Sequence, residues 1–119
     1  MKRITFILLT ALLISQTMAQ GQILDIVGPL TQTAFGCLAE DGYQFAIVRA
    51  YSLDNGGSID PNAIQTIMNS QNANIYTQTY MVICRNNDAA SQVNTVISTL
   101  GSLYTYTWIK VQPNTVAGC

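Results

Sequence analysis

The sequence predicts an α/β fold in which four parallel strands alternate with helices in a single domain, and three observations lead to this prediction. The chain has 119 residues, which is enough for one domain and too short for two. Apolar runs rich in β-branched and aromatic residues alternate with stretches of helical periodicity, in units of roughly 25–30 residues. Strands joined through helices run parallel, because such connections are right-handed crossovers.

Residues 1–19 predict a secretory signal peptide rather than part of the domain. Two basic residues precede an apolar run over residues 4–14, and small residues follow at Thr17 and Ala19. The run is too short to span a bilayer, which needs roughly 20 apolar residues. We therefore expect cleavage after Ala19, a secreted protein that is not held in a membrane, and a single α/β domain over residues 20–119.

The first strand and the first helix follow directly. Residues 22–27 form a short apolar run that predicts a buried strand. In residues 29–41 apolar side chains recur at helical spacing, and Gly42 follows as a stop signal. The expected buried face of this helix consists of Leu30, Ala34, Phe35, Cys37 and Leu38.

The second strand and helix have clear local signals. Residues 44–51 (QFAIVRAY) predict a strand from their β-branched and aromatic content, and a loop at residues 54–57 follows it. Asp60 followed by Pro61 is typical of a helix start, with the aspartate as N-cap and the proline at the first helical position. The apolar positions of this helix are Ala63, Ile64, Ile67 and Met68.

The last two strands flank a third helix. Residues 75–83 predict the third strand, and residues 106–112 predict the fourth, which Pro113 ends. Asp88 is the expected N-cap of the helix between them, and Gly101 is its expected stop. The apolar positions of this helix are Ala89, Val93, Val96, Ile97 and Leu100.

This order of elements fits two architectures, a small doubly wound sheet and part of a (β/α) barrel. The pattern alone does not choose between them. In both, the functional region lies at the carboxyl ends of the strands. The residues that the sequence offers there are Asp25, Arg49, Tyr51, Tyr80, Cys84, Lys110 and Gln112.

The composition excludes several classes of function. The chain contains no histidine, which excludes His-based triads, His-ligated zinc and histidine acid–base catalysis. Removal of the signal peptide leaves six acids and three bases, and a net charge of −3 offers no basic surface to nucleic acid. Gly28-Pro29 after the first strand lacks the glycine spacing of a phosphate-binding loop. No metal or other cofactor is expected.

The three cysteines indicate disulfide chemistry. Cys37, Cys84 and Cys119 would be exported into an oxidising compartment, where disulfides form and persist. Their number is odd, so at least one thiol stays free or pairs outside the chain. The pairing stays open at this point.

Several segments match a known family of hydrolases in the same order. They are an aspartate-bearing first strand, a helix with F-x-C-L, the segment GYQFAIVRAY at residues 42–51 and the Asp60-Pro61 helix start. A tyrosine at position 80 and a fourth strand led by Trp108 extend the match. The chain thereby resembles the glycoside hydrolase family 25 lysozymes, particularly their short animal and protist branch. The resemblance covers the mature chain but only the N-terminal half of the family's barrel, and it implies cleavage of the muramic acid–glucosamine backbone of peptidoglycan.

Carried over by position, the resemblance implies which residues form the site. Asp25 matches the aspartate that the family places at the end of its first strand, and Tyr80 matches a pocket-lining tyrosine. The family's fourth strand ends in an Asp-x-Glu pair that supplies the general acid and an assisting carboxylate, whereas Lys110 and Gln112 stand there in this chain. Glycoside hydrolysis needs a carboxylic acid to protonate the leaving oxygen, and glutamine has no titratable proton. We therefore expect a lysozyme-like protein of antibacterial defence or bacterial digestion that is truncated after the fourth strand and catalytically impaired.

Other functions stay open. An active muramidase could borrow carboxylates from a partner chain, and a non-catalytic secreted module could bind carbohydrate or peptidoglycan in the same groove. A small doubly wound protein unrelated to lysozymes is a further alternative. Half a barrel leaves two unpaired edges and one uncovered face, so a homodimer or a partner chain could complete it.

Further residues have both a binding and a structural interpretation. Arg49 and Tyr51 are candidates for substrate binding, but an unpaired charge within an apolar strand is costly, so Arg49 could instead pair with a carboxylate or a carbonyl. Lys110 could pair with Asp25, or it could be an exposed edge-strand lysine. The aromatic residues, including Tyr80, could stack on sugar rings or belong to the core, and Tyr80 is the one expected in the pocket.

Overall fold

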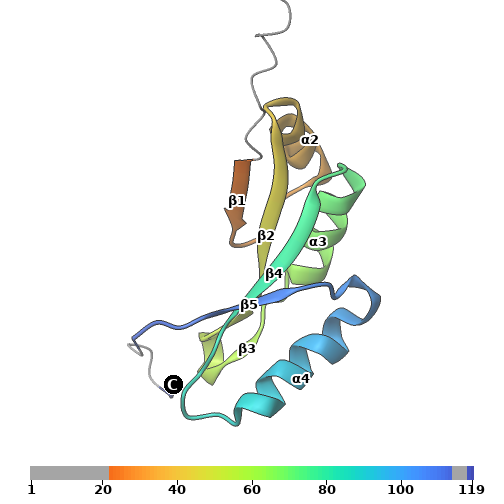
Figure 1. The fold of residues 1–119 in the computed structure, drawn as a ribbon. Helices are drawn as coiled ribbons and strands as arrows, with labels where there is room; N and C mark the ends of the chain where they lie inside the picture. Colours follow the sequence, from red (N-terminus) through yellow and green to blue (C-terminus); the bar gives the residue numbers. More distant parts are fainter. Residues whose placement is uncertain (1–21, 114–117) are drawn as a thin grey trace, which may run out of the picture.

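Strands and helices alternate along the chain in the computed structural model, which describes residues 22–113 and 118–119 (Figure 1). The expected signal peptide at residues 1–19 lies outside the described residues. The elements are β1 (Gln22–Ile26), α2 (Gln32–Glu40), β2 (Tyr43–Ser52), η1 (Asp54–Gly56), β3 (Ser58–Ile59), α3 (Ala63–Asn72), β4 (Tyr76–Val82), α4 (Ala89–Leu100), η2 (Gly101–Leu103) and β5 (Thr107–Lys110). None of the helices among the described residues is long and apolar enough to cross a membrane.

The sheet has the strand order β1-β2-β4-β5, and these four strands are all parallel. The fifth strand, β3, pairs antiparallel with the end of β2. Neighbours in the sheet thus follow chain order, whereas a doubly wound sheet reverses its order at a switch point. The predicted α/β fold is confirmed, and the arrangement is that of half of an α/β barrel.

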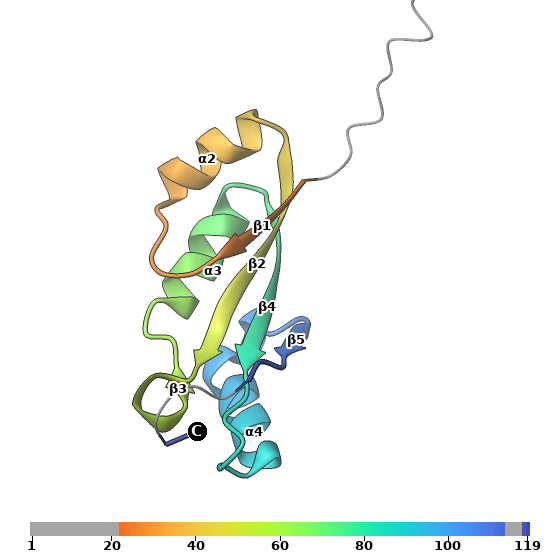
Figure 2. The same ribbon diagram turned by 90° about the vertical axis from the view of Figure 1, so that its left-hand side faces the viewer.

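The helices cover one face of the sheet. Val48 of β2 and Met81 of β4 share a buried cluster with Ile67 of α3 and Val96 of α4. A second cluster on α2 centres on Phe35, which is fully buried. Figure 2 shows α2 and α3 on the same side of the strands. Because side chains alternate along a strand, the opposite face of the sheet carries the residues that lie between these core positions.

A disulfide joins Cys84, just after β4, to Cys119. It closes a loop with a sequence separation of 35 residues and packs with Leu53 and Val82 on the side of the sheet away from the helices. Cys37 is a free, exposed cysteine. The prediction that Cys37 belongs to the buried face of its helix is wrong, because position 37 lies about 200° around the helix from the buried Phe35.

Helix boundaries confirm one predicted cap and correct another. Asp88 caps α4, where its side chain accepts a hydrogen bond of 2.7 Å from the Ser91 N–H. Asp60 does not cap α3 directly, since the helix begins at Ala63. Asp60 instead accepts a hydrogen bond of 3.0 Å from the Asn62 N–H in the preceding turn.

Strand β5 is shorter than the sequence predicts. It ends at Lys110 rather than at residue 112, so Gln112 lies beyond the strand. The strand pairs with β4 through residues 107–110, and in the strand order β5 stands at the edge. Lys110 pairs with Val82, the last residue of β4, so the residues after Lys110 have no strand partner.

Candidate functional site

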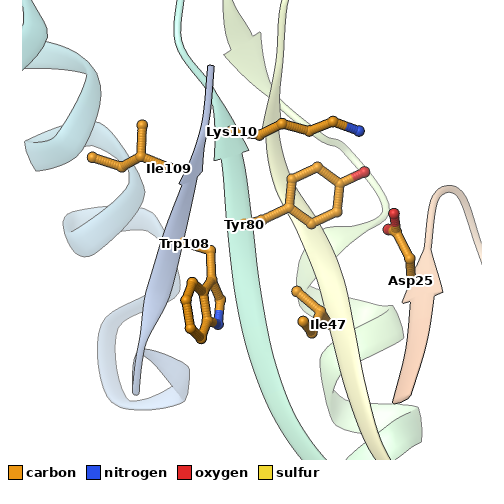
Figure 3. Close-up of a pocket in the computed structure, with 6 residues that line it drawn as sticks. All are labelled: Asp25, Ile47, Tyr80, Trp108, Ile109 and Lys110. Carbon is orange, nitrogen blue, oxygen red and sulfur yellow. The ribbon is translucent and has the colours of Figure 1, made fainter. Parts of the chain in front are cut away.

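A hollow of about 360 Å³ lies on the face of the sheet opposite the helices. Each of the four parallel strands contributes to it (Figure 3). The lining residues are Asp25, Ile47, Tyr80, Trp108, Ile109 and Lys110. The parallel register explains why they meet, because Asp25 pairs with Ile47 on β2 and Tyr80 pairs with Trp108 on β5.

Tyr80 occupies the centre of the hollow. Its side chain is 6% exposed, and Figure 3 shows its ring lying between Lys110 and Ile47 with the hydroxyl directed toward Asp25. Burial raises the pKa of Tyr80, and the charge of Asp25 and a side-chain hydrogen bond to it raise this pKa further, while the Arg49 charge lowers it. Tyr80 therefore stays protonated at neutral pH, so its hydroxyl can donate a hydrogen bond to the Asp25 carboxylate.

Lys110 approaches the same ring from β5. Its Nζ lies 5.5 Å from the centroid of the Tyr80 ring, within the range of a cation–π interaction. The part of the chain that the structure describes contains two side-chain ion pairs, and Arg49 is the basic residue in each of them. Lys110 thus shares the hollow with Asp25 but forms no ion pair with it; of the two interpretations that the sequence left open, the structure supports the exposed lysine on an edge strand.

Trp108 lies two residues before Lys110 and lines the same hollow. Its indole N–H donates a hydrogen bond of 2.7 Å to Oε1 of Gln78 on the neighbouring strand. The side chain is nevertheless 59% exposed. The hydrogen bond holds an open aromatic surface at the edge of the sheet.

Arg49 lines a neighbouring hollow together with Tyr80, Lys110 and Gln112, but its charge is paired with carboxylates of the chain itself. Its Nε and Nη2 donate to the same Asp60 oxygen at 2.9 and 2.8 Å. A second carboxylate, that of Asp54, lies 3.9 Å from Nη2. The structural interpretation of Arg49, a charge paired with a carboxylate, is the one that the structure supports.

The structure places Tyr51 away from Asp25 and Tyr80. It is buried in the core cluster with Ala50 and Met81. A register shift in the β2–β4 pairing lies between Arg49 and Tyr51. This irregularity breaks the alternation that would otherwise put both side chains on one face.

The chemistry available in the hollow is limited. Among its six lining residues, Asp25 is the single carboxylic acid, and the Tyr80 hydroxyl engages it. Lys110 supplies a positive charge, while Trp108 and Tyr80 supply aromatic surface. Such a site can stack on a sugar ring and hydrogen-bond its hydroxyl groups, but it does not hold the two carboxyl groups that most glycosidases use.

Comparisons with known proteins identify the family of the chain. Residues 16–117 match the family described as lysozyme-like protein 1. The chain is 33% identical over 93 residues to a protein of Dictyostelium discoideum described as probable GH family 25 lysozyme 2. This match covers 74% of the chain and 43% of the relative, so the chain spans less than half the length of that curated protein. No solved structure matches the chain.

Proposed function

The chain belongs to the lysozyme-like protein family and resembles the glycoside hydrolase family 25 lysozymes, and from that premise we propose that it binds peptidoglycan glycan in the hollow around Tyr80 without the turnover of an active muramidase. The class of glycan is inferred from the family. The site is inferred from the residues that line the hollow on the face of the sheet opposite the helices, which is called the helix-free face below. In this proposal the chain is a binding protein derived from a hydrolase.

The observation that carries the proposal is that Asp25 is the single carboxylic acid among the described residues that line the hollow. Lys110, at the end of β5, lines the hollow around Tyr80, and Gln112 lines the neighbouring hollow that also contains Arg49. Neither side chain is the carboxylic acid that protonates the leaving oxygen in most glycosidases, and the glutamine amide has no titratable proton. General acid–base catalysis contributes about 10²–10⁴-fold to an enzymatic rate, and this contribution is lost.

The binding half of the proposal rests on the open aromatic surface. Trp108 is held by Gln78 and remains accessible, while the Tyr80 ring forms the floor of the hollow beside it. Aromatic rings stack on the apolar faces of pyranoses, and polar groups around them bind hydroxyls. A hollow of about 360 Å³ falls within the usual range of ligand pockets.

Binding and turnover are tested together by incubating the purified protein with insoluble peptidoglycan. We expect the protein to sediment with the polymer while no reducing ends are released. Trp108→Leu should release most of the bound protein, whereas Tyr106→Leu, which removes an exposed aromatic residue that does not line the hollow, should not. Failure of the wild-type protein to sediment would refute the binding site, and release of reducing ends would refute the loss of turnover.

The exposed edge of the sheet supports a second copy of the chain as a partner. Trp108, Ile109 and Val111 are large apolar residues that lie exposed on or just after β5. Since β1 and β5 are the two ends of the strand order, two copies related by a two-fold axis could pair β5 of each with β1 of the other and close the two half barrels into one parallel barrel. Sedimentation at increasing concentration should reveal a dimer that Ile109→Lys abolishes, and a monomer at all concentrations would refute this assembly.

Secretion is also part of the proposal. The Cys84–Cys119 disulfide supports it, because such bonds persist in oxidising compartments. Together with the family, secretion would place the protein where it meets bacteria, in defence or in digestion. N-terminal sequencing of the protein recovered from the medium should start at Gln20, and retention of the full chain inside the cell would contradict the proposal.

A further inference from the structure

The positive charge of Lys110 is uncompensated on the helix-free face. The described part of the chain has three basic residues, of which Arg49 is paired with Asp60, and Arg85 is exposed in the loop after β4. Lys110 is exposed, contacts the face of the Tyr80 ring, and has no carboxylate within ion-pair distance in that part of the chain. The ammonium is therefore available to an anionic group of a ligand.

An aromatic surface lies next to this charge. Trp108 and Lys110 are two residues apart on β5 and line the same hollow, as expected for positions that share a face of a strand. Figure 3 shows the two side chains on either side of the Tyr80 ring. A ligand that fits both needs a flat apolar ring and an anionic substituent on that ring.

The opposite side of the hollow limits where the anion can lie. Asp25 lines it from β1 and is turned to the Tyr80 hydroxyl. A carboxylate near Asp25 would be repelled, whereas one near Lys110 would be attracted. The hollow is therefore electrically asymmetric, and it orients a charged ligand as well as attracting it.

We propose that Trp108 and Lys110 form a subsite for a carboxylate-bearing pyranose, in which the sugar ring stacks on the indole and the carboxylate pairs with the ammonium. This inference rests on the proposed glycan binding and adds a preference that the family resemblance does not contain, since the family carries an acid where this chain has Lys110. Charged hydrogen bonds contribute more than neutral ones, so the preference for the charged sugar over its neutral counterpart should be about tenfold.

The single tryptophan of the chain makes the subsite directly observable. Its fluorescence is followed at constant ionic strength during titration with glucuronic acid, with the methyl ester of glucuronic acid, and with N-acetylglucosamine. We expect glucuronic acid to bind about tenfold more tightly than the two neutral sugars. Acetate, which has the charge without the ring, should produce little change.

Variants separate the charge from the ring. Lys110→Gln should lower the affinity for glucuronic acid to that for its methyl ester, while Lys110→Arg should retain the preference for the acid. Arg85→Gln is the matched control, because it removes an exposed cation that does not line the hollow. Equal affinity for the acid and its ester, or a preference that survives in Lys110→Gln, would overturn the subsite and leave glycan binding intact. No response to any sugar would overturn both.

Discussion

Replacement of Arg49 by methionine should destabilise the protein strongly, because it leaves a buried carboxylate without its main partner. Asp60 is 3% exposed, and one of its oxygens accepts both Arg49 hydrogen bonds, at 2.9 and 2.8 Å. After the substitution, the Asn62 N–H would remain as the hydrogen bond that the structure gives this carboxylate. Breaking a buried ion pair from one side costs about 3–5 kcal/mol.

This loss is large enough to measure by thermal and urea unfolding. In a domain of about 100 residues, 1 kcal/mol corresponds to about 4–8 °C in Tm, so we expect Tm to fall by at least about 12 °C. The double variant Arg49→Met/Asp60→Asn should recover most of the loss, since it removes both charges. Arg85→Met, at an exposed position, should change the free energy of unfolding by less than about 0.5 kcal/mol.

The opposite result has a clear meaning. The free energy of unfolding of Arg49→Met could instead lie within about 1 kcal/mol of the wild-type value while the variant binds peptidoglycan less well. Arg49 would then contribute to ligand binding rather than to the stability of the fold. That outcome would refute the reasoning from the Asp60 ion pair and restore the binding role that the sequence suggested for Arg49.

Three further predictions concern the site, the disulfide and a helix cap. The pKa of Tyr80 should lie above about 10 and fall in Asp25→Asn, as followed by ultraviolet absorbance against Tyr80→Phe; an unchanged pKa would contradict their contact. Because folding favours neutral Tyr80, its contribution to stability is complete below about pH 10 and is lost as pH rises further. Replacing Cys84 and Cys119 by serine should cost about 4 kcal/mol in urea unfolding, from the 35-residue separation, and a cost near zero would show that the disulfide constrains little. Asp88→Ala should cost about 1 kcal/mol and Asp88→Asn much less; equal losses would argue against capping.

The fold was largely predictable because local signals and burial agree in the centre of the chain. The apolar pattern of β2 and the Asp88 cap of α4 mark elements that the structure contains at nearly the same residues. The end of β5 was not predictable, since residues 111–112 continue the strand pattern, while the neighbouring strand β4 ends at Val82, the partner of Lys110. The two-residue strand β3 was missed because it is too short for any periodicity to appear.

The site was predictable in part. Asp25, Tyr80 and Lys110 were expected at strand ends, and the parallel register brings them into one hollow. The partner of Arg49 was not foreseen, because Asp60 before a proline is equally typical of a helix cap, and the ion pair forms only when β3 folds back along β2. The burial of Tyr51 depends on an irregularity in β2 for which the sequence offers no glycine or proline signal.

The role of Gln78 was also missed. A glutamine within a strand carries no functional signal in the sequence, and the contact of Gln78 with the Trp108 indole depends on the β4–β5 register. This contact holds the one tryptophan of the chain in place at the hollow.

The proposed loss of turnover rests on a hollow in which Asp25 is the single carboxylic acid among the lining residues, whereas most glycosidases use two. Clearing of bacterial cell-wall suspensions by the purified, folded protein tests this most directly, with Asp25→Asn measured in parallel and an active muramidase as the positive control. We expect that neither the wild-type protein nor the variant clears the suspension. Clearing by the wild-type protein that disappears in Asp25→Asn would contradict it and show that Asp25 catalyses hydrolysis despite Lys110 and Gln112.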